Sequence, residues 1–186
     1  MIKFLRLFLF PFSIAYWLIT GLRNKLYDIG VFKSTSFSIP IISVGNLSTG
    51  GTGKTPHIEY LISKLSDNYK LATLSRGYKR STKGFVLAST ESTSKDIGDE
   101  PKQFKTKYPD LAVAVDSNRV NGVQNLLKLD DDIQMILLDD AYQHRKINRS
   151  INILLTEYSK PFYKDHILPV GNLRESRSGF KRANII

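Results

Sequence analysis

Short apolar runs alternate with amphipathic segments along most of this chain. The spacing of apolar residues predicts helices over residues 54–65 and 117–129. Continuous apolar runs, typical of strands covered on both faces, occur at residues 39–44, 70–75, 111–116, 133–140 and 151–157, with a shorter one at 84–89. Strands that alternate with helices indicate βαβ units. We therefore expect an α/β fold with a mostly parallel sheet and helices on both faces.

Polar residues follow several of these predicted strands. They are a glycine-rich segment after the first strand, Ser75 and Arg76 after the second, Asp116 after the run at 111–115, and Asp139 with Asp140. In a parallel sheet, ligands bind beyond the carboxyl ends of the strands. We therefore expect these residues to share one site.

The first 30 residues have a different character. An apolar run at 7–20 is bracketed by basic residues that all precede Asp28, the first acidic residue: Lys3, Arg6, Arg23 and Lys25. A helix needs about 20 apolar residues to span a bilayer, and this run is shorter and contains Pro11. It is also not followed by the small-residue cleavage site of a signal peptide.

A helix at the membrane interface fits this region better. Aromatic and aliphatic groups would enter the headgroup boundary, where Tyr16, Trp17 and Tyr27 belong, and arginines would meet lipid phosphates. The alternative is a core helix packed on the domain. We expect membrane contact, because exposing so many large apolar groups requires a partner. The predicted organisation is a membrane-associated helix at 1–30 and a domain at 36–186.

Composition limits the remaining possibilities. The chain has 186 residues, of which 41% are hydrophobic and 24% charged, as in an ordinary globular domain. The absence of cysteine excludes disulfides, thiolate metal sites and a cysteine nucleophile. The formal net charge of +10 favours anionic partners. Among these, we expect phosphorylated ligands and an anionic membrane surface, and no nucleic acid.

Residues 46–56 read NLSTGGTGKTP and contain most of a phosphate-binding loop. The usual pattern is G-x-x-x-x-G-K-[ST] between a strand and a helix. Gly53, Lys54 and Thr55 match this pattern, and Ser48 replaces the first glycine. The alternative is a glycine-rich turn with a chance lysine. The predicted flanking strand and helix favour a phosphate loop, and hence a P-loop NTPase-like fold.

Each part of this loop has a chemical role in that interpretation. Glycines let successive backbone N–H groups turn toward phosphate oxygens, and the helix N-terminus adds partial positive charge. Lys54 would reach the β- and γ-phosphates, and Thr55 would offer its hydroxyl to Mg²⁺. Pro56 fits the first helical turn, and Ser48 fits if its backbone avoids positive φ. The predicted nucleotide-binding residues are Ser48, Thr49, Gly50, Gly51, Thr52, Gly53, Lys54 and Thr55.

A phosphate loop also requires an acidic metal partner at the end of another strand. Asp139 is the natural Mg²⁺ ligand, directly or through water, because this cation prefers carboxylate and water oxygens. Asp140 would be a second ligand or a positioning residue. The alternative is that both aspartates only terminate the strand.

Five motifs occur together along the chain. They are VGNLSTGGTGKTP (44–56), SRGY (75–78), GDEP (98–101), DDAYQH (139–144) and PVGNLRES (169–176). In this order they resemble the tetraacyldisaccharide 4'-kinase family, the lipid A 4'-kinases of Gram-negative bacteria. The resemblance covers nearly the whole chain, and the family's phosphate loop also lacks the first glycine, as here at Ser48.

The chain departs from the family pattern in two respects. The family often reads D-D-G-[LF]-Q-H, where this chain has Ala141 and Tyr142, a difference that we expect to alter packing and not chemistry. The family is also longer, with a second α/β domain. The final residues, KRANII, look like the beginning of a strand, so we expect the kinase domain to be incomplete and the chain to be truncated before a second domain.

The resemblance implies an ATP- and Mg²⁺-dependent lipid kinase. It would transfer the γ-phosphate of ATP to the 4'-hydroxyl of a tetraacylated disaccharide 1-phosphate, a lipid A precursor. The implied location is the cytoplasmic face of the bacterial inner membrane, peripheral or anchored by the N-terminal helix. A lipid acceptor would explain the basic, aromatic start of the chain.

The resemblance also assigns roles to further residues. Asp99 of GDEP would accept the proton of the acceptor hydroxyl, working with a histidine of the second domain. Lys54, Asp139 and Asp140 complete the implied catalytic set. Without the family, Asp99 reads as a turn or helix-cap residue ahead of Pro101.

The implied acceptor or phosphate contacts come from three of the motifs. They are Arg76 and Tyr78, Gln143 and His144, and Arg174 and Glu175. Arg174 would hold a phosphate through two hydrogen bonds. The alternative for His144 is a satisfied hydrogen-bond donor beside two carboxylates. For Arg76, Tyr78, Arg174 and Glu175 it is a position on the surface.

Two other functions are compatible with the loop alone. One is a nucleotide-binding module or an ATPase or GTPase switch without lipid kinase activity, although the N-K-x-D motif for guanine is absent from the chain. The other is a fragment that binds ATP weakly and does not catalyse.

Overall fold

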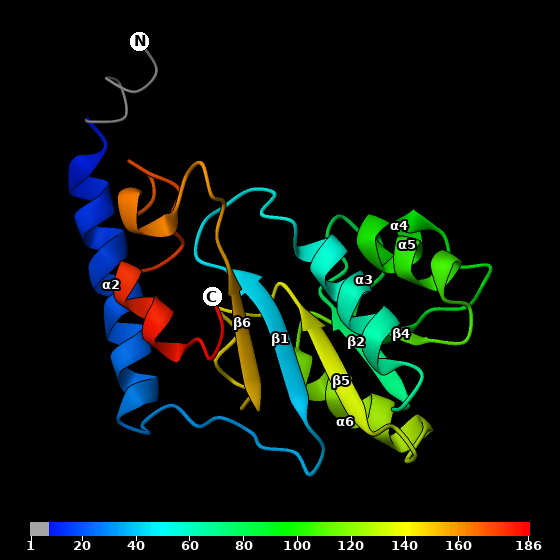
Figure 1. Cartoon of the computed structure of the whole chain (residues 1–186). Coiled ribbons are helices and arrows are strands. Elements are labelled where there is room, and N and C mark those ends of the chain that lie inside the picture. Colours follow the sequence, from blue (N-terminus) through cyan, green and yellow to red (C-terminus); the bar gives the residue numbers. More distant parts are fainter. Residues whose placement is uncertain (1–7) are drawn as a thin grey trace.

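The core of the structure, a computed structural model that describes residues 8–186, is a six-stranded sheet (Figure 1). The strand order is β3-β4-β2-β5-β1-β6. Five strands are parallel and β3 pairs antiparallel with β4. Their bounds are β1 (Ile41–Asn46), β2 (Leu71–Ser75), β3 (Val86–Leu87), β4 (Ala112–Val115), β5 (Met135–Asp139) and β6 (Ile151–Leu155). The predicted α/β fold is confirmed.

Helices cover both faces of the sheet, and residues of β1 alternate between them. Ile42 and Val44 pack with α3 (Lys54–Leu65) and α5 (Asp99–Lys107), whereas Ile41 packs in the cluster that contains α6 (Arg119–Leu129). Strands with apolar residues on both sides are what two helical layers require. The continuous apolar runs in the sequence therefore arise, as predicted, from strands that are covered by helices on both faces of the sheet.

The predicted helix at 54–65 is present with the same bounds. The helix predicted at 117–129 begins at Arg119, because the Asn118 side chain caps it by accepting a hydrogen bond from Asn121 N. Of two short helices, α4 (Ser94–Ile97) is not among the predicted elements, and α5 was implied only by the alternative that Asp99 is a helix-cap residue ahead of Pro101. Helices of four and nine residues give an apolar period too few turns to be recognised.

The N-terminal helix α2 (Phe10–Asp28) lies beyond the β6 edge of the sheet (Figure 1). The C-terminal segment, with the short helices η1 (Phe162–Lys164) and η2 (Arg177–Arg182), lies between them. Its last residues return to the sheet, where Ile185 forms a parallel bridge with Ile153 of β6. The strand-like character predicted for the final residues is thus visible as a bridge.

The face of α2 that contacts the protein is polar. Its only buried residue is Ser13, whose hydroxyl donates to Ile167 O and accepts from Val170 N. Further along, Tyr16 donates to Arg174 O and Asn24 donates to the Glu175 carboxylate at 2.6 Å. Polar contacts with the C-terminal segment therefore hold this helix in place.

The apolar side chains of α2 point away from the protein. Phe12, Ile19 and Leu22 are each more than 60% exposed, and Trp17 is half exposed. The helix thus packs on the domain through its polar face, but its large apolar side chains are not part of the core. No helix in residues 8–186 combines the length and apolar content needed to cross a bilayer.

Candidate active site

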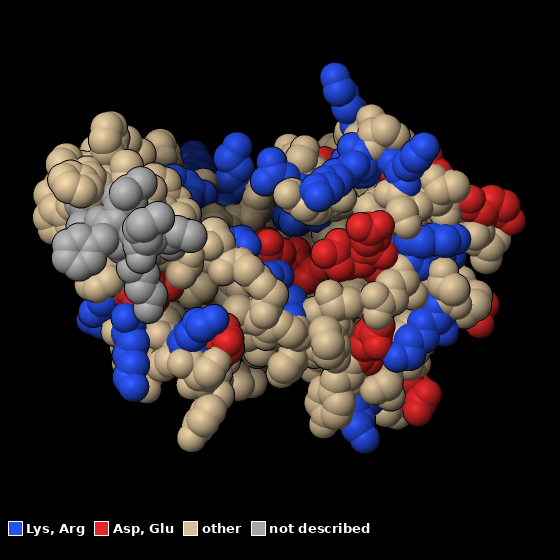
Figure 2. Space-filling model, turned by 90° about the horizontal axis from the view of Figure 1, so that it is seen from above, with Lys and Arg blue, Asp and Glu red and all other residues tan. Residues whose placement is uncertain are grey.

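The carboxyl ends of the parallel strands surround a cavity of about 780 Å³. Seen from above, acidic side chains lie in the hollow at the centre of this face, with lysines and arginines near its rim (Figure 2). The cavity is lined by the phosphate loop and α3 start (49–56), residues 75–78, Glu100, Asp139, Asp140 and Arg174. Residues from five separate segments thus meet, as the positions after the strands predicted. The prediction was wrong for Asp116, which is buried and does not line the cavity, because its carboxylate accepts hydrogen bonds from Asn118 N and Asn121 Nδ2 at the start of α6.

The phosphate loop runs from the end of β1 into α3. Gly50 and Gly53 have φ of 114° and 79°, a left-handed region that other residues rarely adopt, and Gly53 caps the helix. Asn46 donates to Thr52 Oγ1 at 2.9 Å and so ties the loop to the strand. Lys54 and Thr55 are the first residues of α3, and Pro56 lies in its first turn, as expected.

The structure explains why Ser48 can replace glycine. In residues 8–186, the only residues besides glycine with positive φ are Lys79 and Asp140, so Ser48 meets the predicted condition. Ser48 forms an antiparallel bridge with Leu173 and is not among the residues that line the cavity. At this position the chain pairs with another segment instead of turning sharply.

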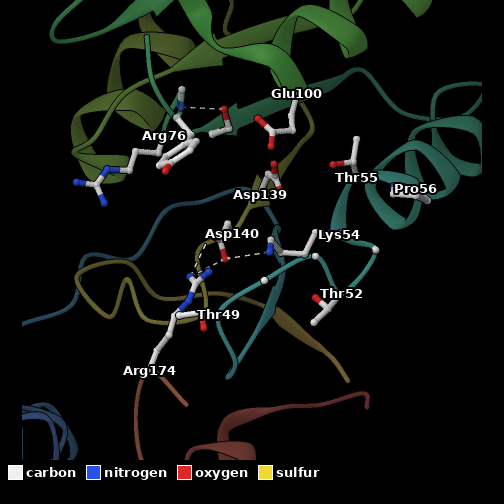
Figure 3. Close-up of a pocket in the computed structure, with 16 residues that line it drawn as sticks. Thr49, Thr52, Lys54, Thr55, Pro56, Arg76, Glu100, Asp139, Asp140 and Arg174 are labelled. Carbon is white, nitrogen blue, oxygen red and sulfur yellow. Dashed lines mark hydrogen bonds and ion pairs between the residues drawn. The ribbon is translucent and has the colours of Figure 1, made fainter. Parts of the chain in front are cut away.

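The same pairing brings Arg174 to the phosphate loop. Thr49 N donates to Asn172 O at 2.8 Å, and Arg174 N donates to Leu47 O at 2.7 Å. Two segments more than 120 residues apart thus form a short ladder. As a result, the Arg174 guanidinium reaches the cavity opposite Lys54 (Figure 3).

Asp140 lies between these two cations. Its carboxylate is 3.0 Å from Arg174 Nη1 and 3.7 Å from Lys54 Nζ (Figure 3). Its φ of 46° is unusual for a residue with a side chain. The negative charge of Asp140 therefore compensates the positive charges of Lys54 and Arg174. In a phosphate-loop protein these two cations would face the bound nucleotide.

Asp139 is the buried carboxylate of the cavity. Its side chain is 6% exposed, and its Oδ1 has no hydrogen-bond partner among the described residues. Its pKa is raised to about 6, first by burial and then by the nearby charges of Asp140 and Glu100, whereas Lys54 and Arg119 oppose the shift. An unsatisfied carboxylate oxygen near other carboxylates and the Thr55 hydroxyl fits a hard divalent cation such as Mg²⁺.

Glu100 is a cavity residue that the sequence reasoning missed. Its side chain points into the cavity toward Asp139 (Figure 3). The neighbouring Asp99, the predicted proton acceptor, is exposed and is not among the lining residues. Both belong to the first turn of α5, so the helix directs consecutive side chains differently. The GDEP motif was the available signal, but it does not reveal which carboxylate faces inward.

The SRGY and GDEP motifs are in backbone contact. A Cβ on Gly98 would lie 3.1 Å from Gly77 Cα and from Tyr78 O, and one on Gly77 would lie 2.8 Å from Ile97 O. Both glycines also have positive φ. Glycine is therefore required on both sides, and the contact fixes the start of α5 beside Arg76 and Tyr78, which line the cavity.

A second hollow of about 320 Å³ adjoins the first. The two share Arg76, Asp140 and Arg174 as lining residues. The remaining walls come from α2, the start of α6 and the end of the DDAYQH motif: Tyr16, Thr20, Arg23, Ser117, Arg119, Gln143 and His144. The N-terminal helix therefore forms one wall of a pocket next to the phosphate loop.

Gln143 and His144 both line this second hollow. Gln143 donates to Asn46 O at 2.8 Å, which fixes its amide beside β1. His144 has a pKa lowered to about 4, first by burial and then by the surrounding positive charges of Arg119, Arg149, Lys146 and Arg23. The histidine is therefore neutral and lies in a region of positive potential.

Glu175 occupies a different position from its motif neighbour Arg174. It is 3% exposed and does not line the two hollows. Its carboxylate accepts hydrogen bonds from Asn24 Nδ2, Arg182 Nη2 and Gln143 Nε2. It thus connects α2 to the rest of the site, and a contact of Glu175 with the acceptor stays a prediction.

The Ala141 and Tyr142 departure affects packing, as expected. Both residues are buried, and the Tyr142 hydroxyl donates to Gly179 O at 2.7 Å. A Cβ on Gly45 would lie 2.7 Å from Tyr142 Cβ and 3.0 Å from Tyr142 N, so glycine allows the backbone at residue 142 to approach β1 closely.

Comparison with known proteins gives a consistent result. The model of the LpxK family, tetraacyldisaccharide-1-P 4'-kinase, matches residues 5–186. A tetraacyldisaccharide 4'-kinase of Flavobacterium johnsoniae is 60% identical over 98% of this chain and 54% of its own length. The corresponding protein of Bacteroides thetaiotaomicron is 52% identical over 96% of this chain and 47% of its own length.

A solved structure is also similar. The crystal structure of LpxK from Aquifex aeolicus in complex with ATP superposes with a TM-score of 0.88 and 40% identity, over 97% of this chain and 57% of that one. The present chain therefore spans about half the length of the relatives it matches.

Proposed function

This chain belongs to the tetraacyldisaccharide-1-P 4'-kinase family, and we propose that the whole protein transfers the γ-phosphate of ATP to the 4'-hydroxyl of a tetraacyldisaccharide 1-phosphate in lipid A biosynthesis. One observation carries the proposal. The phosphate loop, three carboxylates and Arg174 line a single cavity that continues into a second hollow beside the exposed apolar helix α2. A phosphate donor and an amphipathic acceptor would thus meet at Asp140.

In this proposal the loop at residues 49–55 binds the ATP phosphates. Backbone N–H groups of the loop and the N-terminus of α3 would surround them, and Lys54 would exchange its ion pair with Asp140 for the β- and γ-phosphates. Arg174 would neutralise charge on the transferred group. Phosphoryl transfer depends mainly on such positioning and charge compensation.

Thr55, Asp139 and Glu100 would hold Mg²⁺, with Asp140 as a fourth oxygen donor beside them. When bound, the cation would neutralise phosphate charge during transfer. For Asp139 this requires loss of its proton, which its raised pKa makes possible near neutral pH. The residues remain proposed ligands, chosen by the burial of Asp139 and by their common cavity.

Asp99 is proposed to accept the proton of the 4'-hydroxyl, with a histidine from the part of the protein beyond this chain. Support comes from its position at the start of α5, where the contact between Gly98 and Gly77 fixes the turn. Its exposure leaves the carboxylate accessible to a substrate hydroxyl. General base catalysis of this kind contributes about 10²–10⁴-fold.

We place the acceptor sugar in the second hollow, against Gln143, His144 and Arg76, with its acyl chains along α2. The exposed apolar face of α2 would lie in the interfacial region of the bilayer. Residues 1–30 would thus act as a peripheral anchor, and residues 36–186 as the phosphate-loop domain. The location that follows is an anionic membrane surface, the cytoplasmic face of the inner membrane.

The proposal is tested by reconstituting the full-length protein in mixed micelles with ATP, Mg²⁺ and the disaccharide lipid. We expect ATP turnover to depend on the acceptor and the product to carry a new phosphate at the 4' position, identified by mass spectrometry and ³¹P NMR. ATP hydrolysis at the same rate without acceptor, and no phosphorylated lipid, would contradict it.

A further inference from the structure

The segment that pairs with the phosphate loop is a closed turn, residues 165–173, which we call the support turn. Its two ends are joined by backbone hydrogen bonds, because Leu173 N donates to His166 O at 2.9 Å and Leu168 N donates to Leu173 O at 3.0 Å. The turn therefore has a defined shape of its own before it reaches the phosphate loop.

One carboxylate, that of Asp165, ties the first residues of the support turn to the last. Its Oδ1 accepts hydrogen bonds from His166 N at 2.7 Å and from Asn172 N at 3.3 Å, and its Oδ2 accepts one from Asn172 Nδ2 at 3.0 Å. None of the ion pairs within residues 8–186 involves Asp165. The carboxylate therefore binds amide groups of the turn instead of a cation.

Gly171 packs closely against the same part of the turn. A Cβ on Gly171 would collide with His166 O and would lie 2.5 Å from Asp165 Oδ1. Glycine is therefore required at this position for close approach, and it allows the Asp165 carboxylate to lie inside the turn.

The opposite side of the support turn is held by α2. The hydroxyl of Ser13, a residue that is 4% exposed, donates to Ile167 O at 3.2 Å and accepts from Val170 N at 3.1 Å. The turn is thus fixed from two sides, by Asp165 within it and by Ser13 from the N-terminal helix.

Asn172 connects the support turn to the phosphate loop. Its backbone N and its Nδ2 both donate to Asp165, and its carbonyl oxygen accepts from Thr49 N at 2.8 Å. The Thr49 amide is therefore used in this pairing, which leaves the amides of residues 50–55 to face phosphate oxygens. The position of Asn172 thus sets where the loop begins.

We propose that Asp165 is a positioning residue for ATP binding, which acts on the phosphate loop through Asn172. This inference rests on the proposed function, in which residues 49–55 bind the ATP phosphates. Where the usual pattern has its first glycine, this chain has Ser48, and pairing with Leu173 fixes the backbone there. Without the Asp165 carboxylate, Asn172 can leave its paired position, and ATP binding then has to restore it.

The test measures ATP affinity of the full-length protein by isothermal titration calorimetry with Mg²⁺ and without acceptor. Asp165→Asn keeps the size of the side chain, but in either orientation of the new amide one hydrogen-bond donor of the turn faces another. We expect Kd for ATP to rise about tenfold, as it would if about one tenth of the molecules kept the loop paired. Asp67→Asn, at an exposed carboxylate just after α3, is the matched control and should bind ATP normally.

The acceptor side of the site should be unaffected. Because Ser13 holds the other side of the support turn, Asp165→Asn loosens Asn172 without detaching α2. We therefore expect KM for the disaccharide lipid, measured at saturating ATP, to change less than twofold.

A second substitution tests the hydrogen bond between the two side chains. Adding Asn172→Asp to Asp165→Asn exchanges donor and acceptor and keeps the net charge, while the backbone carbonyl that binds Thr49 is retained. We expect the double variant to return to within about threefold of the wild-type Kd for ATP.

Three outcomes would overturn the positioning role. They are wild-type ATP affinity in Asp165→Asn, an equal rise in Kd for ATP and in KM for the acceptor, and failure of the double variant to restore binding. The last two would mean that the substitution disturbs the domain as a whole.

Lys54→Ala separates this inference from the proposed function in the same titration. If it binds ATP as tightly as the wild type, the phosphate-loop assignment fails, and the positioning role fails with it. If Lys54→Ala weakens binding and Asp165→Asn does not, only the positioning role is refuted.

Discussion

The two ends of the site have opposite electrostatic character. At the phosphate-loop end, Glu100, Asp139 and Asp140 gather in one cavity with Lys54. At the α2 end, Arg23, Arg119 and Lys146 surround His144. The ionisable groups respond accordingly, because burial beside carboxylates raises the pKa of Asp139 to about 6 and burial beside cations lowers the pKa of His144 to about 4.

The first cavity and the second hollow that adjoins it form one groove. The difference in charge between its ends shows how this groove can select two kinds of partner. An end with an excess of carboxylates attracts a metal cation and, through it, a nucleotide. An end with an excess of positively charged side chains attracts an anion directly. Asp140 and Arg174, which both hollows share, mark the boundary. The polarity of the groove therefore predicts which end each substrate occupies, and the following experiments test each end separately.

The largest effect is expected at the phosphate-loop end. Lys54→Ala removes the charge directed at the transferring phosphate, and kcat should fall about 10³-fold, as for loss of a major electrostatic contact. The measurement is ³²P transfer by the full-length protein at saturating acceptor. Lys128→Ala should transfer normally, and a Lys54→Ala protein with wild-type kcat would refute the phosphate-loop assignment.

The acidic end should lose stability as pH rises. The pKa of Asp139 is about 6 in the folded protein, whereas in the unfolded chain it has its ordinary value of 3.8. Stability from the protonated form is thus complete below pH 4 and is lost as pH rises through 6. The difference corresponds to on the order of 3 kcal/mol.

Asp139→Asn removes this dependence. Without Mg²⁺, we expect the variant to exceed the wild type in unfolding free energy by this amount at pH 7.5 and to match it near pH 4, as measured by urea titrations. Mg²⁺ should stabilise the wild type at pH 7.5 and leave the variant unchanged. If the difference in unfolding free energy between wild type and variant stays constant from pH 4 to 7.5, Asp139 is not the source of this pH dependence.

The basic end should respond to pH in the opposite direction. The pKa of His144 is about 4 in the folded protein, whereas in the unfolded chain it has its ordinary value of 6.5. Stability is therefore lost as pH falls from 6.5 toward 4, by about 2 kcal/mol after allowing for its partial exposure. His144→Gln should remove this loss in urea titrations between pH 7.5 and 4.5. Equal acid sensitivity of both proteins would argue against the positive potential.

The smallest effect is expected outside the groove, on α2. The double variant Leu18→Ser, Ile19→Ser replaces two exposed apolar side chains. We expect its affinity for anionic vesicles, obtained from the fraction of protein that sediments with them, to be about tenfold lower. Leu129→Ser, at a residue that is 62% exposed on α6, is the matched control. Unchanged sedimentation with vesicles would exclude this face of α2 as the membrane contact.

Much of the fold was predictable because its signals are local. Apolar runs of six to eight residues identified the parallel strands, and the apolar spacing at 54–65 identified α3 with the correct bounds. The glycines of the phosphate loop are equally local, since positive φ at Gly50 and Gly53 depends on the residue itself. Fold class and loop could therefore be predicted before any contact was known.

Side-chain direction and distant pairing were not predictable in the same way. The GDEP motif contains two adjacent carboxylates, and only the placement of α5 shows that Glu100 lines the cavity and Asp99 does not. The reason for Ser48 lies in its pairing with Leu173, more than 120 residues away. Motif order suggested that these segments belong together, but not which atoms meet.

The sequence by itself determined an α/β sheet, a phosphate loop at the end of its first strand and an amphipathic start of the chain, because each depends on periodicity or on the backbone freedom of single residues. Tertiary structure alone decided that α2 turns its polar side inward, that Arg174 reaches the loop, and that carboxylates and cations separate into opposite ends of one groove. These features arise from contacts between distant segments, whose energies depend on how the whole chain packs.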